Sequence, residues 1–318
     1  MILVTGATGF VGREVVAAAV QRGFQVRAAV RRTPVSPVAG AEYFLGADLA
    51  DDNDWTAALA GVDAVVHTAA RVHVMNDESH EPISEFRKIN VAASVNLARQ
   101  AAAAGVRRFI FISSVKVNGE RNVGDRPFCE IDPAAPVEPY GISKREAENG
   151  LYRVAKETGL EIVVIRPPLV YGPGAKANFA ALVRAVARGI PLPLAAIRNK
   201  RSLIALDNLV DFVLVCITHS AAANETFLVS DGEDLTTSEL IRRIGTALRR
   251  PARLIPIPKW VLVLGATVLF KRDLVRRLLD SLRIDSSKAR TLLGWAPPLS
   301  VDEGLEKAVR LLRRDANA

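Results

Sequence analysis

The stretch "ILVTGATGFVG" at residues 2–12 decides the fold class. Its first four residues have the character of a buried strand, and Gly6, Gly9 and Gly12 follow with two residues between each pair. Glycine allows the backbone to turn tightly and to approach a pyrophosphate, which the N–H groups of the next helix can bind. A strand, a glycine loop and a helix in this order predict a dinucleotide-binding site, whereas the glycines alone would also fit an ordinary turn.

Short apolar runs alternate with alanine-rich, helix-forming stretches after this loop. Such alternation predicts a parallel sheet with helices on both faces, which is a Rossmann-type, doubly wound α/β fold. The expected strands are 2–5, 25–30, 64–69, 108–113 and 161–167, and the expected helices are 12–22, 53–60, 84–104 and 140–158.

The length of 318 residues favours two lobes over a single core. We predict that residues 1–171 form an NAD(P)-binding Rossmann domain and that residues 206–231 return to it. A smaller C-terminal lobe, built from residues 172–205 and 232–318, would bind the substrate.

The net charge of +8 results from 42 Lys and Arg against 34 Asp and Glu, with late basic pairs such as Arg249–Arg250. Nucleic-acid binding would combine such charge with stacking aromatic residues, but these are only 6% of the chain and no basic stripe contains them. We therefore expect a small anionic ligand and no nucleic acid. Cys129 and Cys216 have neither a disulfide framework nor a metal-ligand spacing, which suits a reducing compartment and predicts no metal.

A strand that starts at residue 2 leaves no room for a signal peptide. The longest apolar run, "WVLVLGATVLF" at 260–270, is too short to span a bilayer. We expect this run to form a buried helix of the second lobe, and a patch that rests on a membrane surface is the alternative. The sequence thus predicts a cytoplasmic protein without stable membrane insertion.

The stretch "YGISK" separates Tyr140 and Lys144 by one helical turn, directly after Pro139, a favourable residue at a helix start. A free phenol has a pKa near 10, and a neighbouring ammonium and an oxidised nicotinamide would both lower it toward a working value. Ser114 ends an expected strand about 25 residues upstream. Together with the glycine loop, this spacing predicts a catalytic tyrosine–lysine pair.

The second expected strand ends in Arg31 and Arg32, where NAD-specific sites usually have an acidic residue for the ribose 2′-hydroxyl. A guanidinium matches a 2′-phosphate because it can bond two oxygens at once. This favours NADP(H). NAD(H) remains the alternative if the two arginines are only exposed surface charges.

These motifs, with "GADLAD", "VVHTAA", "INVAASVNL", "VIRPPLVYGPG" and "LGWAP", resemble the extended short-chain dehydrogenase/reductase superfamily and its NAD-dependent epimerase/dehydratase family. The resemblance covers nearly the whole chain. It implies that Asp48 contacts the adenine with Leu49 beside it, and that residues 67–70 line the nicotinamide side, although His67 fits a packed histidine equally well. The implied cofactor-binding residues are Gly6, Thr8, Gly9, Phe10, Val11, Gly12, Arg31, Arg32, Asp48, Leu49, Thr68, Ala69, Ala70, Tyr140, Lys144 and Pro167.

In the resembling family the tyrosine is the general acid/base, the lysine also holds the nicotinamide ribose, and the serine hydrogen-bonds the reacting oxygen. The resemblance assigns these roles to Tyr140, Lys144 and Ser114, with Ser113 as a structural neighbour. It assigns Trp295 to packing. The implied substrate-binding residues are Ser114, Lys116, Asn178, Arg201 and Arg277.

The residues after Ser114 reduce the number of reactions that fit this chain. The family's 4,6-dehydratases carry an Asp-Glu pair there, but this chain has Val115 and Lys116, which are unsuited to that proton transfer. Asn118 and the arginines near residue 31 favour a 4-ketoreductase similar to bacterial lipopolysaccharide O-antigen enzymes that reduce UDP-2-acetamido-2,6-dideoxy-hexos-4-ulose. A UDP-hexose or UDP-N-acetylhexosamine 4-epimerase with tightly bound NAD is the alternative, and a non-catalytic NADP-binding sensor is the third. The family often forms dimers through helices that correspond to 84–104 and 140–158, so a homodimer is expected.

Overall fold

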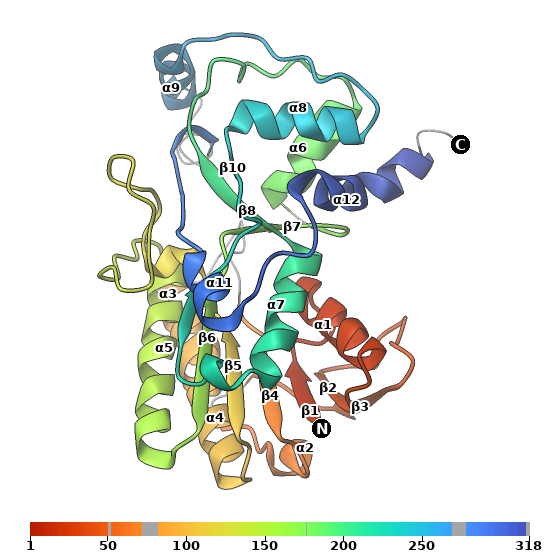
Figure 1. The fold of residues 1–318 in the computed structure, drawn as a ribbon, viewed down its shortest axis with the longest axis vertical. Helices are drawn as coiled ribbons and strands as arrows, with labels where there is room; N and C mark the ends of the chain where they lie inside the picture. The colour runs from red at the N-terminus through yellow and green to blue at the C-terminus, as the bar shows by residue number, and fades with distance from the viewer. Residues whose placement is uncertain (50–51, 72–81, 176, 269–277, 316–318) are drawn as a thin grey trace.

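A seven-stranded, wholly parallel sheet forms the larger lobe of the computed structural model, which describes residues 1–49, 52–71, 82–175, 177–268 and 278–315 (Figure 1). The strand order is β3-β2-β1-β4-β5-β6-β9. The chain therefore proceeds outward from β1 and returns to β4 on its other side, which opens the crevice that binds ligands in such folds. The strands are β1 (Ile2–Thr5), β2 (Val26–Val30), β3 (Ala41–Leu45), β4 (Ala64–His67), β5 (Arg108–Ile112), β6 (Glu161–Arg166) and β9 (Thr226–Leu228).

Each face of this sheet has its own hydrophobic core, because successive side chains of a strand point to opposite faces. In β1, Ile2 and Val4 pack with the helices α1 and α7, whereas Leu3 packs with α2, α4 and α5. The helices of the first face are α1 (Phe10–Gln21), α7 (Leu206–Thr218) and α11 (Ser287–Leu293), and those of the second are α2 (Thr56–Leu59), α4 (Ala93–Ala103) and α5 (Pro139–Thr158).

The smaller lobe lies beyond the carboxyl ends of the large sheet and has a three-stranded sheet of its own (Figure 1). Its strand order is β10-β8-β7, with β7 parallel and β10 antiparallel to β8. These strands are β7 (Leu169–Tyr171), β8 (Arg201–Ala205) and β10 (Asp234–Leu235), and the helices are α6 (Ala177–Ala187), α8 (Thr237–Ala247), α9 (Lys259–Val268) and α12 (Val301–Asp315).

The predicted doubly wound α/β fold is confirmed, with three local differences. The sequence pattern missed β3, whose residues are mostly half-buried and so carry little apolar signal. The helix expected over 84–104 is divided into α3 (Pro82–Phe86), a π-helical turn (Arg87–Ala92) and α4. The small sheet begins at Leu169, before the lobe boundary expected after residue 171, because β7 pairs with β8.

The interpretation of residues 260–270 as a buried helix is wrong for the described side chains of α9. Trp260 is 69% exposed and Leu264 is 59% exposed. Leu262 packs partly against the core of the smaller lobe. The run is thus a surface helix that contacts its own lobe on one side. Within the described ranges, no helix has both the length and the apolar character to cross a membrane.

Trp295 lies in the core, as predicted. Its ring centroid is 4.9 Å from that of Phe212 on α7, and its indole N–H donates to Asp211 at 2.7 Å. The C-terminal segment is thereby held against the first face of the large sheet.

Candidate active site

The glycine loop between β1 and α1 is packed closely against its own backbone and against the residues that follow β4. Gly6 has a φ of +66°, and a Cβ there would lie 2.7 Å from the backbone nitrogen of Ala69. A Cβ on Gly12 would lie 2.2 Å from the carbonyl oxygen of Gly6. Gly9 donates to that same oxygen at 2.8 Å and precedes α1, whose start has no side-chain cap from the described residues. The loop therefore fits the pyrophosphate of a dinucleotide, which the first N–H groups of α1 would bind.

Phe10 and Val11 of this helix pack partly against the core of the first face. They therefore present backbone N–H groups to the loop and apolar side chains to the protein interior. Gly12 is buried at the same turn.

A hollow of about 710 Å³ continues from the loop across the ends of β2 and β3. Thr8, Arg31, Arg32 and Asp48 line it together, as expected for the adenosine half of a cofactor. Both arginines are exposed, and neither guanidinium has an ion-pair partner in the described part of the chain. Leu49 lies beside Asp48, to whose carboxylate its N–H donates at 2.9 Å, and packs against the core of the second face.

The end of β4 is adjacent to the glycine loop, so Thr68, Ala69 and Ala70 are near the expected cofactor path. The Thr68 hydroxyl donates to the carbonyl oxygen of Thr5 at 2.7 Å. His67 lies on the buried side of the strand. Its ring nitrogens contact the hydroxyls of Thr5 at 2.7 Å and of Ser94 at 2.9 Å.

Burial lowers the pKa of His67 to about 3, and the Lys144 charge acts in the same direction. With both ring nitrogens occupied inside the protein, His67 is a packed histidine. Of the two interpretations that the sequence left open for this residue, the structure therefore supports packing.

The two serines at the end of β5 have different surroundings. The Ser113 hydroxyl is buried and donates to Glu148 at 2.6 Å. The Ser114 hydroxyl caps the short 3₁₀ helix Val115–Val117 by accepting from the Lys116 N–H at 3.2 Å, and it lines a cavity. Only Ser114 is therefore positioned to contact a ligand. The carbonyl of Pro167, at the end of β6, supports this turn by accepting from Val115 at 3.0 Å.

Tyr140 and Lys144 lie on one face of α5, because Pro139 begins the helix and four residues make about one turn. Tyr140 is half-buried and lines the same cavity as Ser114. Lys144 is buried behind it. Its ammonium donates to the carbonyl oxygen of Ile112 at 2.8 Å and lies 4.4 Å from the Phe111 ring centroid and 6.0 Å from that of Tyr140.

The surroundings that the protein itself provides shift the pKa of Tyr140 upward, whereas the expected lowering also involves an oxidised nicotinamide. Burial raises the pKa of Tyr140 to about 12. Burial also lowers the pKa of Lys144 to about 7, although the Glu148 charge opposes this shift. Desolvation is the largest cause of both shifts, and burial of this kind could not be deduced from sequence spacing alone.

A cavity of about 470 Å³ lies between the two lobes and brings the expected substrate residues together. Its wall contains Ser114, Lys116, Tyr140, Asn178 and Arg201, although these come from the turn after β5, from β8 and from three helical segments. Arg277, the fifth substrate residue that the resemblance implies, lies outside the described residues. The apolar part of the wall comprises Val115, Pro168, Leu169, Val170, Phe179, Leu182, Leu203, Leu240, Leu278 and Leu282.

Sequence reasoning missed Glu120 and Thr237, which also line this cavity. The Lys116 ammonium forms ion pairs with Glu120 at 3.3 Å and with Glu138. The spacing of Lys116 and Glu120, i to i+4, was the available signal for the first pair. Thr237 begins α8, and no sequence pattern indicated a role for it, because its position in the cavity wall depends on how the two lobes pack.

Asn90 is a further residue that the sequence did not single out. It is buried in the π-helical turn, accepts from the Arg71 N–H at 2.8 Å and donates to the Ser143 hydroxyl at 3.0 Å. These hydrogen bonds connect Arg71, which follows β4, with Ser143 of α5, the residue directly before Lys144. An amide within the apolar stretch "INVAASV" was the signal that could have found it.

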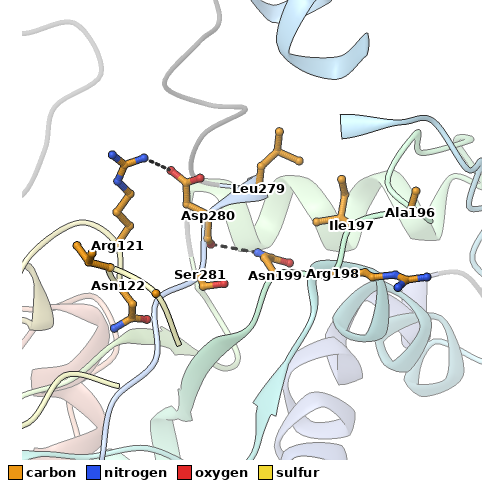
Figure 2. A pocket seen from close by; sticks show the side chains of 11 residues that line it. Arg121, Asn122, Ala196, Ile197, Arg198, Asn199, Leu279, Asp280 and Ser281 are labelled. Carbon is orange, nitrogen blue, oxygen red and sulfur yellow. Dashed lines mark hydrogen bonds and ion pairs between the residues drawn. The ribbon is translucent and has the colours of Figure 1, made fainter. Parts of the chain in front are cut away.

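Figure 2 shows a second cavity, of about 520 Å³, near the other side of the 278–282 segment. Arg121 and Asp280 form an ion pair across it at 4.0 Å, and the Asn199 amide donates to the backbone carbonyl of Asp280 at 3.1 Å. None of the described residues expected to bind cofactor or substrate lines this cavity. It is separate from the candidate active site.

Comparisons with known proteins agree with this geometry. The model of the NAD dependent epimerase/dehydratase family matches residues 2–230. The chain belongs to this family. A UDP-glucose 4-epimerase of Vibrio cholerae is 45% identical over 97% of this chain and 94% of its own. A dihydroflavonol 4-reductase of Hordeum vulgare is 32% identical over 76% of this chain and 73% of its own.

Among solved structures, the UDP-glucose 4-epimerase of Thermotoga maritima with UDP-glucose covers 99% of both chains, with a TM-score of 0.78 and 26% identity. The resemblance to the epimerase/dehydratase family is therefore confirmed. Membership in it makes the protein an enzyme that uses a nicotinamide dinucleotide, so the interpretation as a non-catalytic sensor is set aside. The expected homodimer stays a prediction.

Proposed function

We propose that this epimerase/dehydratase family member is an NADP(H)-dependent nucleotide-sugar 4-ketoreductase that acts on UDP-2-acetamido-2,6-dideoxy-hexos-4-ulose. The shared cavity of Ser114 and Tyr140, with Lys144 buried behind them, supports the carbonyl–alcohol interconversion that a ketoreductase and an epimerase have in common. The exposed Arg31 and Arg32 beside the glycine loop support the phosphorylated cofactor.

The glycine loop and Lys144 would hold the nicotinamide dinucleotide, which would supply hydride-transfer chemistry at the sugar C4. Ser114 would hydrogen-bond the C4 carbonyl oxygen, and Tyr140 would donate the proton that turns this oxygen into a hydroxyl. A phenol whose pKa is raised to about 12 is fully protonated before the reaction, as a proton donor must be. The protonated form of Lys144, one helical turn away, would then stabilise the phenolate that remains.

The nucleotide would occupy the side of the cavity that the smaller lobe contributes. Arg201 of β8 and Asn178 of α6 line that side and offer polar contacts to a diphosphate. Arginine suits this role because it bonds phosphate oxygens in a bidentate manner and remains charged. The leucine side chains of the same wall offer apolar contact for a base and ribose.

Dehydration is disfavoured by the surroundings of the turn after Ser114. Val115 is buried and cannot transfer a proton. The Glu120 carboxylate, although it lines the cavity, is ion-paired with Lys116. This ion pair therefore does not provide the neutral carboxylic acid that would protonate a departing hydroxyl. We assign Lys116 and Glu120 to contacts with the sugar's polar substituents.

The alternative is a 4-epimerase with tightly bound NAD, which the Vibrio cholerae relative favours by its similarity. Both reactions would use Ser114, Tyr140 and Lys144 in the same way. They differ in the fate of the hydride, because a reductase consumes external cofactor and an epimerase returns the hydride to the same sugar.

One experiment separates the two reactions. Purified protein is mixed with NADPH and the UDP-4-keto-6-deoxy sugar, and separately with UDP-hexoses and no added cofactor. The proposal predicts stoichiometric loss of nicotinamide absorbance and a 6-deoxy alcohol in the first mixture. Rapid formation of the C4 epimer in the second mixture, without consumption of cofactor, would replace the reductase by the epimerase.

A further inference from the structure

The helix α9 exposes apolar side chains on the surface of the smaller lobe. Trp260 and Leu264 are the most exposed, and Val261 is 36% exposed. Successive helical residues are rotated by about 100°, so these three share one side while Leu262, which packs on the lobe, lies opposite. A helix that is apolar on both sides normally has an apolar medium on both sides. One side of α9 thus packs on its own lobe, and the exposed apolar side indicates a contact with a further apolar surface.

The segment around α9 carries most of the net charge of the chain. Residues 249–277 contain eight Lys and Arg and one Asp, so they hold seven of the eight net positive charges. Arg249 and Arg253 belong to the described part of this segment, and both are exposed. Elsewhere the chain is almost balanced. The charge is therefore a local property of the segment that contains the exposed apolar helix.

This segment lies at the outer end of the smaller lobe. The loop after α8 crosses the end of the lobe that is farthest from the seven-stranded sheet, and α9 follows it (Figure 1). At about 1.5 Å per residue, the ten residues of α9 extend over about half of the apolar thickness of a bilayer. The helix is therefore too short to cross a membrane but can lie in its surface, as a tryptophan beside basic residues favours.

We infer that α9 docks the protein on an anionic phospholipid membrane through Trp260, Val261 and Leu264. The exposed Arg249 and Arg253 of the preceding loop add attraction to anionic headgroups. The apolar side chains would enter the region between headgroups and acyl chains, and the basic side chains would attract anionic headgroups. A second copy of this chain is a poorer occupant. A two-fold contact through this surface would bring the same basic segment of both copies together, and like charges repel.

The test is sedimentation of the full-length protein with phospholipid vesicles. Neutral vesicles of phosphatidylcholine are compared with vesicles in which about a quarter of the lipid is anionic phosphatidylglycerol. We expect at least about tenfold tighter binding to the anionic vesicles, and a loss of this difference at about 1 M salt, where charges are screened over a few ångströms.

Two pairs of substitutions locate the binding surface. The change Trp260→Ser with Leu264→Ser should weaken binding to anionic vesicles at least about tenfold, because it removes the apolar side chains that enter the lipid. The matched control is Val123→Ser with Ile131→Ser, which removes two side chains that are 92% and 90% exposed on loops before α5. The control should bind like the unchanged protein, and both variants should keep their turnover with soluble substrate.

Tryptophan fluorescence gives an independent readout. Trp55 and Trp295 are buried, so a change on addition of vesicles reports mainly on Trp260. We expect a blue shift and protection from iodide with anionic vesicles, and no shift in the Trp260→Phe variant, which should still sediment with them. Three results would overturn the inference. The first is equal binding to neutral and anionic vesicles, and the second is unchanged binding of the Trp260→Ser, Leu264→Ser variant. The third is self-association of the protein that this variant abolishes.

Discussion

Glu148 of α5 and Arg166 of β6 form a two-pronged ion pair inside the larger lobe, with Nε–Oε1 at 2.9 Å and Nη2–Oε2 at 2.6 Å. Both side chains are buried. The Ser113 hydroxyl also donates to Glu148, and the Arg166 guanidinium also donates to the Asn118 amide oxygen at 3.1 Å. One buried pair thus connects the helix of Lys144 to the strand end that presents Ser114.

Removal of one partner of this pair should destabilise the protein strongly. Glu148→Ala leaves the Arg166 guanidinium buried without its carboxylate, and such a change typically costs about 3–5 kcal/mol. Urea unfolding should detect a loss of this size. Replacement of both residues, Glu148→Leu with Arg166→Met, should recover much of it, because no buried charge remains.

The matched control is the exposed pair of Lys307 and Asp207, whose side chains are 47% and 39% exposed. Lys307→Ala should change the free energy of unfolding by less than about 1 kcal/mol. A Glu148→Ala variant as stable as the Lys307→Ala variant would contradict the assigned importance of the buried pair.

Loss of the Tyr140 hydroxyl should abolish most of the activity. We expect Tyr140→Phe to reduce turnover at least about a hundredfold while cofactor binding is kept, because the phenol is the proposed proton donor. Tyr152→Phe on the same helix is the control. Its hydroxyl contacts Thr226 at 2.5 Å and does not line the cavity, so this variant should keep its turnover. Near-normal turnover of Tyr140→Phe would remove Tyr140 from the mechanism.

The stability of the protein should decrease as the pH is lowered, because His67 is protonated more readily in the unfolded chain than in the folded protein. Its pKa is about 3 in the folded protein and near 6.5 in the unfolded chain, so the unfolded chain binds more protons between these values. Stability from this residue is therefore complete above pH 6.5 and decreases by about 1.4 kcal/mol per unit below it. Between pH 6.5 and 5 the loss should be about 2 kcal/mol, measured by urea unfolding.

A His67→Gln variant isolates this contribution, because glutamine does not titrate. Its stability should decrease less than that of the unchanged protein over the same pH interval. Identical pH dependence of the two proteins would mean that other groups account for the acid sensitivity.

The cofactor preference should depend on Arg31. We expect NADPH to bind more tightly than NADH, and Arg31→Asp to reverse this order, because the guanidinium attracts a 2′-phosphate and a carboxylate repels it. Titrations that follow nicotinamide fluorescence measure both affinities. Arg99→Asp, at an exposed position on α4, controls for the change in net charge. If NADH binds more tightly to the unchanged protein, the phosphate assignment of Arg31 is wrong.

Local sequence determined the features of this protein that depend on short-range periodicity. The strand–loop–helix order around Gly6, Gly9 and Gly12 follows from residue types within eleven positions. The alignment of Tyr140 with Lys144 follows from one turn of helix after Pro139. Family membership could be predicted because these short motifs occur in one fixed order along the chain.

Tertiary structure decided what depends on contacts between distant residues. The sequence could not distinguish a buried α9 from an exposed one, because an apolar run looks the same whether or not another element covers it. Ser114, Asn178, Arg201 and Thr237 share one cavity only because the two lobes pack together. The upward shift of the Tyr140 pKa likewise results from burial, because desolvation disfavours the phenolate and the atoms that exclude water come together only in the folded chain.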